Sequence, residues 1–78
     1  MEYEDVVIGK RYRLSENHLK KLTSFWRNIT EQCLEQGGGS LVCYKVSNVV
    51  GMYELAPTIE IGKVIQICVY AEDLIEVY

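Results

Sequence analysis

Hydrophobic and polar positions alternate most regularly near the end of the chain. Ile65, Ile67 and Val69 are each separated by one residue, a two-residue period typical of a strand with one face in a core. The alternation stops at residues 71–74, where an acidic pair precedes a leucine, and it resumes at residues 75–77. We therefore expect a strand, a single tight turn whose leucine returns to the core, and a short last strand that closes the sheet.

A helical period replaces the alternation in residues 15–36. The apolar positions recur at intervals of three and four residues, at Leu19, Leu22, Trp26, Ile29 and Cys33. Ser15 has the side chain of a helix N-cap, and the three glycines at residues 37–39 suit a helix C-terminus. The pattern predicts one amphipathic helix over about residues 16–36, with its apolar stripe buried against the sheet. Because such a helix would be about 31 Å long at ~1.5 Å per residue, a break near residues 28–30 is the alternative.

Short apolar runs separated by turn-forming residues predict the remaining strands. These runs occupy residues 6–8, 10–14, 41–50, 49–55 and 59–61. A turn or a bulge is expected at residues 47–48. Pro57 separates the last two runs because proline cannot donate to a strand ladder. Strand parity places Val42, Tyr44 and Val46 on one face, and it turns Tyr12 and Tyr44 inward. Many short strands of this kind predict a compact antiparallel barrel or rolled sheet.

Two segments carry a resemblance to a known family. Residues 8–14, Ile-Gly-Lys-Arg-Tyr-Arg-Leu, resemble the opening strand of small SH3-like barrels, and residues 69–77 are similar to their closing strand, one-turn 3₁₀ helix and last strand. Residues 15–39 depart from the family, which has a loop after its first strand. The resemblance implies a single α+β domain over residues 1–78, namely a small SH3-like antiparallel β-barrel or rolled sheet with one inserted helix. Small SH3-like proteins are frequent among bacteriophage early genes, so it also implies a phage-encoded accessory protein in the host cytoplasm.

The composition and charge are those of one small globular domain. The chain has 78 residues, 49% of them hydrophobic, and a net charge of −3. No apolar run reaches the ~18 residues needed to cross a membrane, and the acidic start is unlike a secretion signal, so we expect a cytoplasmic protein without a membrane partner. Cys33, Cys43 and Cys68 are odd in number and form no C-x-x-C pair, so we expect three reduced, unpaired thiols.

No residue pattern in the sequence indicates catalysis, a metal site or a cofactor. His18 is the only histidine and, without a second histidine or paired cysteines, it is expected to be a solvated side chain on the helix. The adjacent carboxylates of Glu72 and Asp73 point in different directions and have no partner base or nucleophile, so we expect a solvated turn. We therefore predict that the protein is not an enzyme and binds no metal or cofactor.

Small size, an acidic total charge and six tyrosines favour a protein-binding module that regulates or inhibits a larger host protein. The predicted contact surface combines the polar helix face, at Lys20, Lys21 and Arg27, with exposed tyrosines of the sheet, at Tyr53 and Tyr70. Charged side chains of this kind tune partner choice and association rate, while the tyrosines supply apolar contact area.

Two other functions compete with this prediction. One is a nucleic-acid-associated accessory protein whose phosphate-facing patch consists of Lys10, Arg11, Arg13, Lys20, Lys21 and Arg27. The acidic total charge argues against it, because the footprint of a dedicated nucleic-acid binder is basic. The other is a self-assembling structural component, a homo-oligomer in which the apolar helix stripe pairs between copies.

Overall fold

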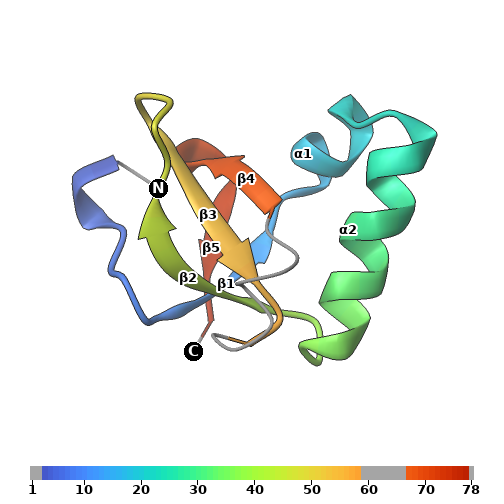
Figure 1. Cartoon of the computed structure of the whole chain (residues 1–78), viewed down its shortest axis with the longest axis horizontal. Helices are drawn as coiled ribbons and strands as arrows, with labels where there is room; N and C mark the ends of the chain where they lie inside the picture. Colours follow the sequence, from blue (N-terminus) through green and yellow to red (C-terminus); the bar gives the residue numbers. More distant parts are fainter. Residues whose placement is uncertain (1–2, 59–66, 78) are drawn as a thin grey trace.

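An antiparallel sheet with two helices on one side of it makes up the fold (Figure 1). The computed structural model describes residues 3–58 and 67–77. Its strands are β1 (Arg11–Leu14), β2 (Leu41–Val46), β3 (Met52–Ala56), β4 (Ile67–Tyr70) and β5 (Leu74–Glu76), in the spatial order β4-β3-β2-β1-β5. All neighbours are antiparallel, and the described strands form an open sheet with β4 and β5 at its edges. The predicted α+β class and antiparallel sheet are thus confirmed, whereas a closed barrel is not observed among these strands.

The helical segment contains two helices where one was predicted. They are α1 (Glu16–Lys21) and α2 (Ser24–Gln36), and both the uninterrupted helix and the alternative break near residues 28–30 are wrong. The chain turns extended at Leu22 and Thr23, with ψ angles of 146° and 162°. Thr23 then caps α2, since its hydroxyl accepts a hydrogen bond from the Trp26 N–H.

Both outer ends of the helical segment agree with the prediction. Ser15 caps α1 by accepting from the His18 N–H, and α2 ends at Gly37. A Cβ atom at Gly37 would overlap the Ser40 carbonyl oxygen, so the tight return of the chain into β2 requires glycine there.

Arg11 fixes that return of the chain. Its guanidinium donates to the carbonyl oxygens of Gly37, Ser40 and Pro57 at 3.0–3.3 Å, and to the Ser40 hydroxyl at 3.1 Å. One side chain of β1 therefore joins the end of α2, the start of β2 and the end of β3. A lysine could not replace it, because a single ammonium cannot span these acceptors as a planar fork does.

The core lies between the inner face of the sheet and the second half of α2. Its fully buried side chains include Tyr12, Leu41, Cys43, Leu55 and Val69, each 0% exposed, and α2 contributes Cys33. The predicted burial of Ile67, Val69 and Leu74 is confirmed, at 6%, 0% and 2% exposure. Ile65 and the expected strand at 59–61 lie outside the described residues.

The closing segment has the predicted form. A one-turn 3₁₀ helix, η3 (Ala71–Asp73), joins β4 to β5, and Leu74 directly after it is buried. β5 then pairs with β1, with Leu74 opposite Leu14. The inward position of Tyr12 is also confirmed, because its ring is fully buried in this part of the sheet.

One predicted strand and one predicted strand face in the first half of the sheet are wrong, although the strand that starts at Leu41 is present as β2. Residues 6–8 form no strand, and Val7 and Ile8 are exposed. In β2 the alternation breaks, because the register with β3 shifts between Cys43 and Lys45. As a result Val46 is exposed, while three consecutive residues at the start of β2 are buried.

Candidate binding surface

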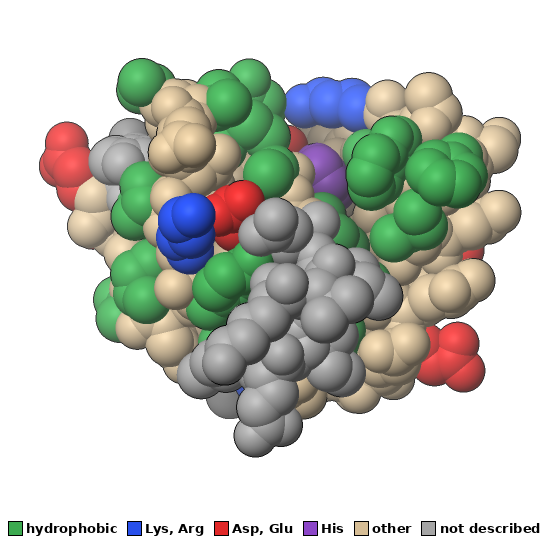
Figure 2. Space-filling view, in the orientation of Figure 1, with side chains coloured by type: hydrophobic (Ala, Val, Ile, Leu, Met, Phe, Trp, Pro, Cys, Tyr) green, Lys and Arg blue, Asp and Glu red, His purple; other side chains and the backbone are tan. Residues whose placement is uncertain are grey.

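The most exposed aromatic side chains of the helical segment stand at the start of α2. Phe25 is 66% exposed and Trp26 is 50% exposed, and their rings meet edge to face with centroids 5.4 Å apart. Figure 2 shows hydrophobic side chains gathered on this side of the molecule. The predicted burial of Trp26 is wrong, because the apolar stripe of α2 meets the core only further along, at Thr30 and Cys33, which are 1% and 3% exposed.

The Trp26 ring borders a cavity between α2 and the start of β4. This cavity, here the Trp26 pocket, has a volume of about 340 Å³ and is lined by Leu22, Trp26, Thr30, Ile67 and Cys68. Apolar side chains therefore make most of its wall, with an exposed thiol on the β4 side. Such a concave apolar wall with one half-exposed aromatic ring fits a large apolar side chain of a partner.

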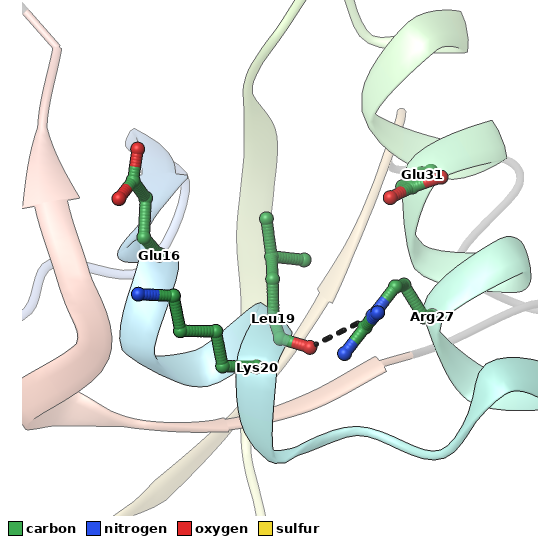
Figure 3. A pocket seen from close by; sticks show the side chains of 5 residues that line it. All are labelled: Glu16, Leu19, Lys20, Arg27 and Glu31. Atoms are coloured by element: carbon green, nitrogen blue, oxygen red, sulfur yellow. Dashed lines mark hydrogen bonds between the residues drawn. The ribbon is translucent and has the colours of Figure 1, made fainter.

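A second, more open cleft separates α1 from α2 (Figure 3). It has a volume of about 250 Å³ and is lined by Glu16, Leu19, Lys20, Arg27 and Glu31. The Arg27 Nε donates to the Leu19 carbonyl oxygen at 3.1 Å, which orients the exposed guanidinium across the cleft. Of the predicted contact residues, Lys20 and Arg27 are thus exposed and brought to one cleft.

Behind the cleft, α1 is attached to η3 by a buried polar cluster. The Ser15 hydroxyl donates to Asp73 Oδ1 at 2.9 Å, and the Ser15 N–H donates to the Asp73 carbonyl oxygen at 2.9 Å. His18 Nδ1 and Lys21 Nζ each lie 3.7 Å from Asp73 Oδ2. The predicted solvation of His18 and Asp73 is therefore wrong, since they are only 7% and 5% exposed. Lys21, one of the predicted contact residues, has an exposed side chain whose ammonium also lies beside the Asp73 carboxylate of this cluster.

Ser15, His18 and Asp73 are the residue types of a hydrolytic triad, but their order is different. In a triad the histidine lies between the serine and the carboxylate and takes the serine proton. Here the Ser15 hydroxyl donates directly to Asp73, and it accepts from the backbone N–H of His18. Because the Ser15 proton is donated to Asp73, His18 cannot accept it. The three residues instead anchor the N-terminus of α1.

The two tyrosines predicted for the contact surface have different fates. Tyr53 is only 4% exposed and belongs to the core, so its predicted exposure on the sheet is wrong. Tyr70 is 45% exposed on β4, opposite Met52 and near Gly51 in the turn that precedes β3. Tyr70 does not line the Trp26 pocket; the β4 residues that do are Ile67 and Cys68.

The basic residues do not form one patch. Lys10 Nζ pairs with Glu76 Oε1 at 3.2 Å, and the Arg11 guanidinium is bonded to backbone carbonyls.

Within the described residues, no group of three or more histidine, cysteine or acidic side chains could hold a metal ion. The described helices are also too short and too polar to cross a membrane.

Comparisons with protein families, with curated proteins and with solved structures give no match for this chain. The contact surface therefore rests on geometry alone. The sequence did carry a signal for the start of α2, since Thr23 and Ser24 directly before two aromatic residues are typical of a new helix start, but it carried none for the exposure of those aromatic residues.

Proposed function

We propose that this protein is a non-catalytic protein-binding module that docks on a larger protein through its helices. The observation that carries the proposal is the exposed, edge-to-face pair of Phe25 and Trp26 beside the Trp26 pocket. Trp and Arg are the residues that most often dominate binding energy when they are buried by a partner. We call the surface formed by Lys20, Leu22, Phe25, Trp26 and Arg27 the helical contact surface.

The charges of this surface indicate the chemistry of the partner. Lys20 and Arg27 are exposed cations that line the cleft between α1 and α2, and Arg27 directly follows the aromatic pair in the chain. The segment that binds should therefore carry a large apolar side chain for the Trp26 pocket and a carboxylate that faces Lys20 and Arg27 while avoiding Glu16 and Glu31, which line the same cleft. Opposite charges at the rim would speed association more than they would raise affinity.

The fold itself we infer to be a variant of the SH3-like barrel. Two features support this inference: the strand order β4-β3-β2-β1-β5 and the 3₁₀ turn between the last two strands. Regulation or inhibition of a host protein in the cytoplasm, by an accessory protein of phage origin, is the role that this resemblance suggests. It rests on the resemblance alone.

Capture from a lysate of the source cells, followed by binding assays with the purified partner, tests the proposal. Phe25→Ala and Trp26→Ala should each weaken binding at least tenfold while the protein stays folded, because both rings are largely solvent-exposed. Val50→Ala is the matched control, since Val50 is an exposed apolar residue in the turn before β3. If Val50→Ala weakens binding as much as Trp26→Ala, the helical contact surface is not the binding site.

A charge-reversed variant tests the polar part of the surface. Lys20→Glu combined with Arg27→Glu should slow association with the same partner and leave the melting temperature nearly unchanged. Lys21 stays unchanged, because a glutamate there would face the buried Asp73 carboxylate at close range. Tyr70→Ala, on the sheet, asks whether the predicted tyrosine takes part as well.

The two competing functions lead to different outcomes in the same experiments. Self-assembly would appear in sedimentation as a dimer that Trp26→Ala dissociates, because a second copy would then cover the aromatic pair. Nucleic-acid binding would appear as a gel shift that collapses with salt. The engagement of Lys10 and Arg11 within the chain argues against the nucleic-acid function.

A further inference from the structure

The only histidine of the chain occupies a site that suits its neutral form. His18 is 7% exposed, and Figure 2 shows the histidine, in purple, at the bottom of a hollow beside the helices. Its Nδ1 lies 3.7 Å from Asp73 Oδ2. Its Nε2 is buried and has no hydrogen-bond partner among the described residues. Protonated histidine donates from both nitrogens, so the charged form would leave one donor unsatisfied.

Two charged groups face His18, one from each element of the cluster. The Asp73 carboxylate of η3 attracts a proton on the ring, whereas the Lys21 ammonium of α1 repels it. Burial is the largest cause and opposes the charge, so the pKa of His18 lies below its ordinary value of 6.5. Among these effects only the attraction of Asp73 works in the other direction.

We propose that His18 makes the attachment of α1 to η3 acid-sensitive, so that a proton taken up from solvent loosens the helix. A group whose pKa is lowered by folding stabilises the protein fully above its unfolded value, 6.5 here, and this stabilisation is lost as pH falls through the folded value.

Release of α1 would also change the helical contact surface. This helix carries Lys20, and the Leu19 carbonyl oxygen that orients Arg27 belongs to it. Mild acid should therefore weaken partner binding, a consequence that rests on the proposed function. The acid sensitivity of α1 itself does not.

An NMR titration of the full chain tests the attachment without any partner. With one histidine, the two ring C–H resonances report a single ionisation, and its midpoint should fall below 6.5. Lys21→Gln should raise that midpoint by removing the repelling charge, and Lys20→Gln, the adjacent exposed lysine, is the control that should leave it unchanged. A wild-type midpoint at or above 6.5, or equal effects of the two lysine variants, overturns the proposal.

Urea denaturation at pH 7.5 and pH 5.5 supplies the second readout. The urea midpoint of the wild type should be lower at pH 5.5, whereas that of His18→Gln should be nearly the same at both values. An equal loss in both proteins overturns the proposal. Partner binding measured at the same two pH values then separates the hypotheses, because absence of binding at pH 7.5 contradicts the proposed function and leaves the titration result standing.

Discussion

The closing segment and the helical segment have almost equally clear hydrophobic periods, yet the two periods differ in how well they predict which residues are buried. In β4, η3 and β5 the predicted core residues Ile67, Val69 and Leu74 are all nearly inaccessible to solvent. In α2 the stripe has the predicted phase, but its largest member, Trp26, is half exposed. A strand paired into a sheet has its inner face covered along its length, whereas a helical stripe tells which side faces the sheet and not how far the contact extends.

Removing the closing segment is the severest test of this comparison. Deletion of residues 71–78 should abolish folding, because β1 loses its partner β5 and the core loses Leu74. Circular dichroism during urea titration should show no cooperative transition. A chain ending after Glu76 keeps all of β5 and should still unfold cooperatively. Cooperative unfolding of the longer deletion would contradict the central role of this segment.

A core truncation in the sheet should have the next largest effect. Leu55 is fully buried in β3, so Leu55→Ala should lower the free energy of unfolding by about 2–5 kcal/mol. Urea denaturation measures the loss. A loss below about 1 kcal/mol would mean that the sheet interior repacks around the cavity far more easily than cores usually do.

The same truncation on α2 should be much milder. Trp26 is half exposed, so Trp26→Ala should cost about 1 kcal/mol or less, in contrast to the several kcal/mol lost when a buried tryptophan is truncated. Acrylamide quenching of the single tryptophan gives an independent measure of its exposure. A loss as large as that of Leu55→Ala would place Trp26 in the core after all.

Loss of the N-cap at the break between the helices should lower the stability still less. Thr23→Ala removes the hydroxyl that caps α2 and should cost about 0.5 kcal/mol, the lower end for N-caps, because this bond is long and exposed. Thr23→Asn retains a capping side chain and should restore the stability. If alanine is as stable as asparagine at this position, the cap does not define the start of α2.

The reactivity of the cysteine thiols gives a measure of burial in these segments that needs no mutation. Cys68 is exposed on β4, whereas Cys33 and Cys43 are buried, and burial raises the pKa of the Cys43 thiol to about 11. A thiol reagent should therefore react quickly with one thiol of the native protein and with three in denaturant. A count of one in denatured, non-reduced protein would show a disulfide and contradict the predicted unpaired state.

Local patterns predicted those parts of the fold that local sequence determines. The 3₁₀ turn, the Ser15 cap and the glycine end of α2 depend on residues within a few positions of each other. The break after α1 was missed because Thr23 and Ser24 lie between stripe positions, so the apolar period continues through it. The shift in β2 has no sequence signal, since it arises in pairing with β3.

The candidate site was predictable in its charges and not in its aromatic residues. Lys20 and Arg27 are exposed as expected, since long charged side chains on a polar helix face are seldom buried. The burial of His18 depends on a cluster that joins Ser15 to Asp73, 58 residues further along the chain. No periodicity reports such a contact. Tyr53 was misplaced for a related reason, because its exposure depends on how β3 sits in the sheet.

The pairing of β1 with β5 also bears on how the chain is made. These are the first and the last of the described strands, so a nascent chain holds β1 without its outer partner until Glu76 has left the ribosome. The side chains of Tyr12 and Leu14 therefore stay exposed until β5 pairs with β1, although the helices and the β2–β3 hairpin can already form. Closure of this edge of the sheet is therefore a late step of folding, and β1 is the segment that a chaperone would need to cover until β5 is available.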